Sequence, residues 1–389
     1  MNFHKIKSVC YRLFAISQYL FFKIIGLSPW SIEASDIITR NRRIESHSFK
    51  CSFSYVGMGY NIIFILVTSS LNIYGFYYTA SIEKVHKSFN IFQRTFAFCS
   101  SFGIIFIVLF ITIRQKFFIN FINHLRNIDK NLRTCTDYDI KYDCTNDSIF
   151  ASNLIVTSAL AILRQLFTKT KLFLFMSLPN FLTTWPLIHY TILINIIKLR
   201  LISINSMLSK LGTTKSKVSQ SRELILKDLD SIKRAYAEIC KGCDQIVALY
   251  GIPTLIMILI YLTKTTHSMY YIVIELISPQ KIDLAVYGAG IVLLFPIYIF
   301  VLLTSSVAKV VKENKETVRI INSLRDRFDM DEEIFEKLMK FSSQLSYLTV
   351  EFTCCGILPL DRDLLMIILS TIVSYLVISV QFYIDLSAN

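Results

Sequence analysis

Seven charge-free apolar stretches constrain the fold of this chain more than any other feature. They cover residues 51–82, 95–113, 148–163, 172–197, 245–263, 284–308 and 364–384. A helix needs about 20 apolar residues to cross the hydrocarbon core of a bilayer, and six stretches reach that length or come within one residue of it. The third has 16 residues, and it spans a membrane only if the Arg164 side chain reaches the interface from its end. The sequence therefore predicts an all-α, polytopic membrane protein with seven transmembrane helices.

The basic residues orient these predicted helices. A net charge of +13 could indicate nucleic acid, but 33 of the 41 Lys and Arg lie before the first stretch and in the second, fourth and sixth connections. Because cytoplasmic loops retain Lys and Arg, we expect a cytoplasmic N-terminus and an extracellular C-terminus. The charge is then explained by topology, and no nucleic-acid partner is expected. A glycan on Asn146, which this topology places in a cytoplasmic connection, would overturn the orientation.

The lengths of the connections predict the domain organisation. Mass is concentrated on the cytoplasmic side, and apolar residues in the fourth connection have helical spacing, so the fourth and fifth helices are expected to continue into the cytosol. Prolines 179, 186, 253 and 296 predict kinks in the fourth, fifth and sixth helices. The predicted parts are a cytosolic N-terminal region (1–50), six helices forming a bundle (51–308) with long cytosolic loops (114–147 and 198–244), cytosolic amphipathic helices (309–363), and the seventh helix with a short extracellular tail (364–389).

An apolar stripe in the sixth connection predicts a further helix there. Ile334, Leu338, Phe341, Leu345 and Leu348 share one helical face, and Asp329 and Asp331 precede it as first-turn acids or caps. The polar face mixes Glu and Lys, whereas an anionic membrane surface would favour a more basic face. We therefore expect packing on other cytosolic helices, of the same chain or of another subunit, as an anchor.

Motifs for catalysis are missing from the sequence. It contains no nucleophile elbow, H-E-x-x-H pair, P-loop or paired intramembrane aspartates. The one C-x-x-C pair, Cys240 and Cys243, lacks the second pair of ligands of a structural zinc site, so these cysteines are expected on a helix surface. We predict no enzyme activity, no catalytic residue, no metal and no cofactor.

The polar residues of the seventh stretch are in phase. Ser374, Ile378, Gln381 and Asp385 follow one another by 4, 3 and 4 positions along one helical face, and Thr371 extends it. An amide facing lipid would cost several kcal/mol, so this face must meet protein or water. Two interpretations stay open from the residues alone: a hydrogen bond to another helix of the same chain, or a water-filled path for cations that ends at Asp385.

Two adjacent motifs resemble those of insect gustatory receptors. The segment SYLVISVQF, residues 374–382, resembles the family signature TYhhhhhQF, in which h is hydrophobic, with serine in place of the usual threonine. The segment FTCCGILPLDRDLL, residues 352–365, resembles the family's sequence before the last helix. The resemblance implies a homotetrameric, ligand-gated, non-selective cation channel related to insect odorant receptors. It also implies a multi-pass protein in the plasma membrane of chemosensory neurons, surrounded by membrane lipid.

The resemblance also implies roles for single residues. Carried over by position, Gln381 forms an amide ring near the narrow part of the pore, and Ile378 forms a hydrophobic gate for the permeating cations. Ser374 and Tyr375 couple this gate to neighbouring helices, Phe382 completes the signature, and Asp385 lies at the outer end.

The implied ligand is a small-molecule tastant in the outer half of the bundle. The candidate ligand-binding residues are Thr184, Trp185, Tyr261 and Tyr287, with His189 deeper, although aromatic residues at membrane interfaces are often anchors only. A bitter compound is the default expectation, and a sugar-responsive channel of the same family is the alternative. Co-assembly with related receptors stays open. The alternatives from another class are a metabotropic seven-helix receptor and a transporter.

Overall fold

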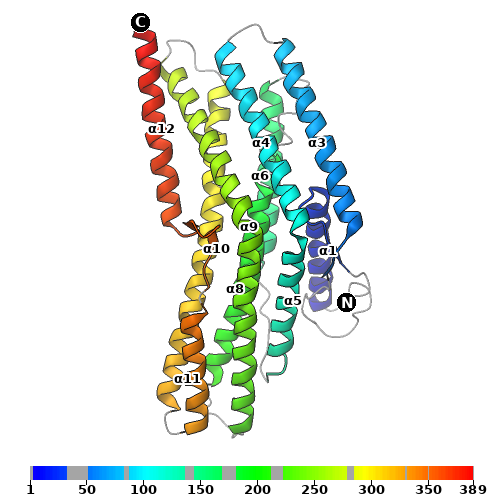
Figure 1. Cartoon of the computed structure of the whole chain (residues 1–389), viewed down its shortest axis with the longest axis vertical. Helices are drawn as coiled ribbons and strands as arrows, with labels where there is room; N and C mark the ends of the chain where they lie inside the picture. Colours follow the sequence, from blue (N-terminus) through cyan, green and yellow to red (C-terminus); the bar gives the residue numbers. More distant parts are fainter. Residues whose placement is uncertain are drawn as a thin grey trace.

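Long helices dominate the computed structural model of this protein (Figure 1). It describes residues 3–32, 51–82, 87–135, 144–168, 181–211, 222–277, 284–328, 331–348 and 350–388. The helices are α1 (Phe3–Ile24), α3 (Tyr55–Ile82), α4 (Lys87–Ile113), α5 (Gln115–Leu132), α6 (Thr145–Thr168), α8 (Trp185–Leu211), α9 (Arg222–Ile277), α10 (Leu284–Arg327), α11 (Glu332–Tyr347) and α12 (Asp363–Ala388). Two short antiparallel pairs complete the description: β1 (Ser31–Ile32) with β2 (Cys51–Ser52), and β3 (Thr353–Cys354) with β4 (Leu358–Pro359).

The predicted spans coincide with these helices, which confirms the all-α membrane fold. By length and composition, four described helices are apolar enough to cross a membrane alone: α3, α8, α9 and α10. The bent pair of α4 and α5 adds a fifth, while α6 and α12 occupy the third and seventh predicted spans. Of the fourth predicted span, residues 172–180 lie outside the described part. The fifth and sixth spans continue into 56- and 44-residue helices, as the spacing of apolar residues predicted for the fifth.

A sharp bend separates α4 from α5 at a position without proline. The axes of α4 and α5 differ by 58° at Arg114, and residues 115–132, predicted as loop, are helical. The Arg114 guanidinium lies over the rings of Phe110 and Phe117, 4.9 and 5.2 Å from their centroids, and donates to the Ala248 carbonyl at 3.4 Å. At Pro186 the helix is interrupted: residues 181–182 are helical, 183–184 form a turn, and Pro186 lies in the first turn of α8, where its missing N–H leaves no bond unmade.

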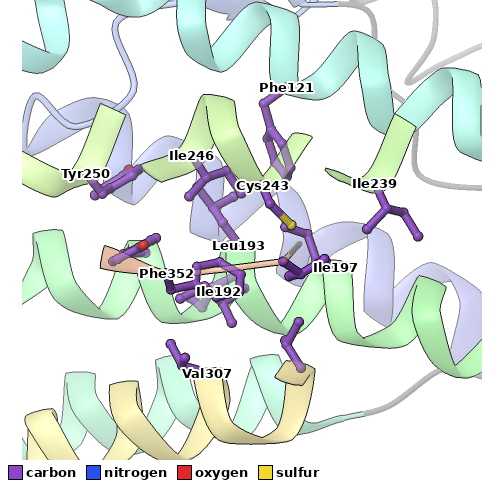
Figure 2. Packing of buried hydrophobic residues seen from close by; sticks show 14 of the residues in the cluster. Phe121, Ile192, Leu193, Ile197, Ile239, Cys243, Ile246, Tyr250, Val307 and Phe352 are labelled. Carbon is purple, nitrogen blue, oxygen red and sulfur yellow. The ribbon is translucent and has the colours of Figure 1, made fainter. Parts of the chain in front are cut away.

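The core is continuous from α5 through α8 and α9 to α10. Figure 2 shows Cys243 of α9 among Phe121, Ile246 and Ile197, with Phe352 reaching in from beside β3. The surface position predicted for Cys240 and Cys243 is wrong: both are buried, and burial raises the pKa of the Cys240 thiol to about 11. A thiol that stays protonated is a poor zinc ligand. Within the described residues, no three His, Cys, Asp or Glu side chains gather as a metal site.

The amphipathic α11 packs on its own chain. Ile334, Leu338, Phe341 and Leu345 are buried against α9 and α10, which confirms the predicted stripe and identifies its partner. The Asp331 carboxylate caps the helix by accepting from the Ile334 amide at 3.2 Å. Further ion pairs hold it to α9: Lys337 with Asp230 at 2.7 Å, and Arg222 with Asp331 and Glu333. Asp329 lies outside the described residues.

Glu238 of α9 ties α5 to α9 and predicts a pH-dependent stability. Burial would raise its pKa, but hydrogen bonds from His124, Lys241 and Asn127 lower the pKa below the ordinary 4.5. The ionised carboxylate therefore stabilises the fold above about pH 4.5, and this contribution is lost as the pH falls through the lowered pKa. We expect Glu238→Gln to reduce the free energy of unfolding by about 1 kcal/mol at pH 7, measured by thermal melting. A difference from wild type that stayed constant down to pH 3 would contradict this.

Candidate functional site

The candidate site is α12, which is fixed to α9 at its first turn. The β3–β4 turn uses the left-handed backbone at Cys355 (φ 57°) and Gly356 (φ 72°). A Cβ added to Gly251 of α9 would lie 3.0 Å from the Cys355 nitrogen, so this turn rests directly on α9. The Asp361 carboxylate then accepts from the Leu364 amide at 3.3 Å and begins the helix. A movement of α9 at Gly251 therefore acts on the start of α12.

One face of α12 packs on its own bundle. Leu364, Ile368 and Ile372 repeat every four residues and are buried, with exposed fractions of 1, 7 and 3%. Their neighbours are α9 and α10, and Figure 1 shows α12 at the edge of the bundle beside these two helices. The packed face thus points inward from the edge.

The polar stripe lies off the packed face. Each residue of a helix turns about 100°, which places Ser374 about 120°, Ile378 about 80° and Gln381 about 140° from the middle of the packed face at Ile368. All three side chains are exposed, Ile378 to 46%. Tyr375, which follows Ser374, is exposed to 58%, although the same rotation places it only about 20° from the middle of the packed face. The side chains of Phe382 and Asp385 lie outside the described part.

Within the described residues, the polar side chains of the stripe find no partner on another helix of this chain. The Ser374 hydroxyl donates to the Ser370 carbonyl at 2.9 Å, and the Thr371 hydroxyl donates to the Ile367 carbonyl at 2.7 Å, both within α12. In the described part of the chain, the Gln381 amide makes no hydrogen bond. Because an amide in hydrocarbon loses its water without compensation, this face requires water or a second chain.

Three of the predicted ligand-binding residues gather at the start of α8. Thr184, Trp185 and His189 are buried, and the Trp185 ring lies 4.3 Å from Phe21 and 5.4 Å from Phe150. These contacts place the group beside the last turns of α1 and the first turns of α6. In the topology that the charge pattern predicts, this end of α6 is cytoplasmic, so Thr184 and Trp185 would lie deeper than the outer half expected for them, beside His189, which was predicted to be deeper. Their role in ligand binding stays a prediction.

Of the two remaining candidates, Tyr261 lies on α9, apart from this group, and the position of the Tyr287 side chain is not described. The Tyr261 side chain is buried, faces Thr183, and meets the Phe300 ring of α10 edge to face at 5.6 Å. It also lines a cavity beside α12. Tyr287 belongs to α10, but its side chain lies outside the described residues. Among the predicted ligand residues whose side chains are described, Tyr261 is thus the one that lines the cavity beside α12.

Sequence reasoning missed the aromatic cluster around His189. The His189 Nδ1 and Tyr250 hydroxyl share a hydrogen bond at 2.6 Å, and the imidazole stacks on Phe22 at 4.2 Å. Trp30 stacks on Phe118 at 3.5 Å in the same cluster. His189 and Tyr250 are 61 residues apart, and no spacing rule connects residues of different helices at that separation.

Removing the Tyr250 hydroxyl tests how much this cluster contributes to the stability of the fold. We expect Tyr250→Phe to lower the free energy of unfolding by about 1–3 kcal/mol, because it leaves the buried His189 nitrogen without its partner. Thermal melting of the purified protein measures the change. The matched control is Tyr298→Phe, since Tyr298 is 36% exposed and should change stability by less than about 0.5 kcal/mol. Equal effects of the two substitutions would contradict the assignment.

Comparisons with known proteins identify the family of this chain. The family model described as 7tm Chemosensory receptor matches residues 17–386, nearly the whole chain. This protein belongs to that family of multi-pass membrane receptors.

Individual relatives match at low identity. The chain is 26% identical to gustatory receptor 28a of Drosophila melanogaster over 167 residues. This aligned segment covers 41% of this chain and 36% of the relative. It is 35% identical over 74 residues to gustatory receptor 28b of the same organism, which covers 19% of this chain and 16% of that one. The matches thus span about a third or less of these relatives' lengths.

Solved structures match over nearly the full length. The insect olfactory receptor OR5 from Machilis hrabei has a TM-score of 0.63 at 11% identity, covering 96% of this chain and 99% of that one. Its complex with eugenol has a TM-score of 0.60 at 12% identity, covering 95% and 99%. This protein therefore shares the helical fold of an insect olfactory receptor.

Proposed function

We propose that this protein is a ligand-gated, non-selective cation channel in which α12 of each copy lines a shared ion path. The observation that carries the proposal is the exposure of the stripe: the side chains of Ser374, Ile378 and Gln381 are exposed and lie off the face that packs on their own bundle. A polar stripe of this kind is stable in a membrane when several copies of the chain assemble so that their stripes line a water-filled path. Membership in the chemosensory receptor family and the SYLVISVQF motif support a homotetramer, with the cytosolic helices around α11 as its anchor.

The stripe supplies the parts of a gate. Four Ile378 side chains form an apolar ring that dewets when the helices are close, and four Gln381 amides replace part of an ion's water shell. Ser374 and Tyr375 couple the gate to neighbouring helices, and Phe382 and Asp385 form the outer part of the path. The permeating species are cations, because Asp385 is the one charged residue of the predicted path.

The ligand is a small-molecule tastant bound within the helix bundle. The complex of the olfactory receptor with eugenol supports a small organic molecule as the ligand class. Tyr261 and Tyr287 are the candidates in the outer part of the bundle, and Thr184, Trp185 and His189 lie beneath them. A bitter compound is the default and a sugar the alternative. The setting is the plasma membrane of chemosensory neurons, with lipid around the bundle and co-assembly with related receptors as a variation.

Current recording under an agonist screen tests this proposal. Expressed in cells whose G-protein signalling is blocked, the receptor should give an agonist-dependent conductance. A response that needs G proteins would support a metabotropic receptor, and current that follows a substrate gradient would support a transporter. Particle images or a crosslinking ladder should show four copies; a monomer would remove the shared path.

A further inference from the structure

A cavity between α9, α10 and α12 is separate from the stripe and from the cluster at His189. Its volume is about 100 Å³. Ile368 and Ile372 of α12 form one wall, and Tyr261 of α9 and Phe300 of α10 form the opposite walls. All four side chains are buried, so the cavity reaches into the interior behind the packed face of α12.

The lining determines which molecules the cavity accepts. No polar atom of the lining residues reaches its surface. The Thr265 hydroxyl donates its proton to the Tyr261 carbonyl at 2.6 Å, so that proton is not available to a guest. Apolar cavities of this kind stay dry, and one of about 150 Å³ lined by Leu, Ile and Phe binds benzene or xenon. At about 100 Å³ and with an apolar lining, the cavity therefore fits an uncharged hydrocarbon group no larger than benzene, which needs no hydrogen bond.

The cavity opens toward the side of the bundle. Leu369 of α12 and Val301 of α10 stand at the opening and are 42% and 44% exposed. Both belong to segments that cross the membrane in the predicted topology, so a molecule dissolved in the bilayer reaches the opening directly. A polar tastant would bind poorly here, because it would lose its hydrogen bonds to water and find no polar partner in the cavity wall.

We propose that this cavity is a second ligand site, which takes a small, uncharged, hydrocarbon-like molecule from the bilayer and holds α12 against α9 and α10. The guest fills space on the packed face of α12 and adds dispersion contacts in the arrangement described here. A movement that separates α12 from α9 loses these contacts, so the guest opposes it. The effect on gating rests on the proposed channel function; the binding itself does not.

Photolabelling of the full-length receptor in lipid nanodiscs tests the binding. The probe is a phenyl diazirine, which adds a three-membered ring to benzene, and peptide mass spectrometry locates the label. We expect labelling of Ile368, Ile372 and Phe300 to saturate with probe concentration and to fall when benzene is added. Labelling of Leu294, which is 65% exposed, should rise linearly without saturation. Linear, benzene-insensitive labelling of the cavity residues would overturn the proposal.

A filling variant and a lipid probe complete the test. Leu369→Phe closes the opening and should abolish the saturable label, whereas the matched control Leu294→Phe should keep it. Unchanged labelling in Leu369→Phe would contradict the site. A phospholipid with a diazirine on its acyl chain distinguishes the source of the hydrocarbon: if it labels the same residues and benzene does not displace it, the occupant is a lipid chain and the proposed small-molecule site is wrong.

Recording separates this site from the channel function. The phenyl compound should raise the half-maximal agonist concentration of wild type by about fivefold, the lower end of ordinary coupling between two sites, and leave Leu369→Phe unaffected. An agonist-evoked current with no such shift would refute the effect on gating. No agonist-evoked current at all, together with saturable labelling, would leave the site standing and refute the proposed channel.

Discussion

Ile378→Ser is expected to raise the resting current of the receptor at least about tenfold without agonist. Burying an isoleucine side chain is worth about 1.5–3 kcal/mol, so replacing an apolar ring with hydroxyls removes far more than the 1.4 kcal/mol that corresponds to tenfold in a barrier. Whole-cell recording at matched surface expression measures this leak.

Val373→Ser is the matched control for the leak. Val373 is 53% exposed and precedes Ser374, but it lies about 100° round the helix from it and off the stripe. The control should keep the resting current of wild type. Leak in both variants would indicate a general loosening of α12, and a silent Ile378→Ser would remove Ile378 as the gate.

Gln381→Lys is expected to reduce agonist-evoked cation current at least about tenfold. In a tetramer the substitution places four positive charges round the path, and each repels a cation by about 1 kcal/mol at 4 Å even in bulk water. The repulsion then exceeds the roughly 1.4 kcal/mol that corresponds to a tenfold fall. Gln381→Ala carries no charge and should change conductance or ion selectivity while expression stays intact.

Val373→Lys is the control for the position of the added lysine. This variant carries the same charge beside the path and should conduct far better than Gln381→Lys, provided that both reach the surface. Single-channel behaviour of Gln381→Ala equal to wild type, with normal current in Gln381→Lys, would contradict the pore assignment.

Features that repeat along one helix could be predicted from the sequence. Apolar length located the spans, and the spacing of Ile334, Leu338, Phe341 and Leu345 located α11 and its buried face. The phase of Ser374 and Gln381 located the stripe. In each case the signal is periodic and lies within one segment, so one sequence is enough to read it.

Features that depend on contacts between helices could not be predicted. The bend at Arg114 arises from its contacts with Phe110, Phe117 and the Ala248 carbonyl, the last 134 residues away. The depth of Trp185 depends on where α1 ends and α6 begins beside it. The sequence also left open whether the stripe faces its own bundle, because phase fixes which residues share a face but not what that face meets.

The central claim is that the Gln381 face of α12 meets water in the open channel. The direct measurement is current through Gln381→Cys while a positively charged, water-soluble methanethiosulfonate reagent is applied with agonist, beside wild type with its native cysteines and Val373→Cys. The account predicts progressive, reductant-reversible block in Gln381→Cys and little change in the other two. Modification that leaves the Gln381→Cys current unchanged, or block that is equal in all three, would contradict it.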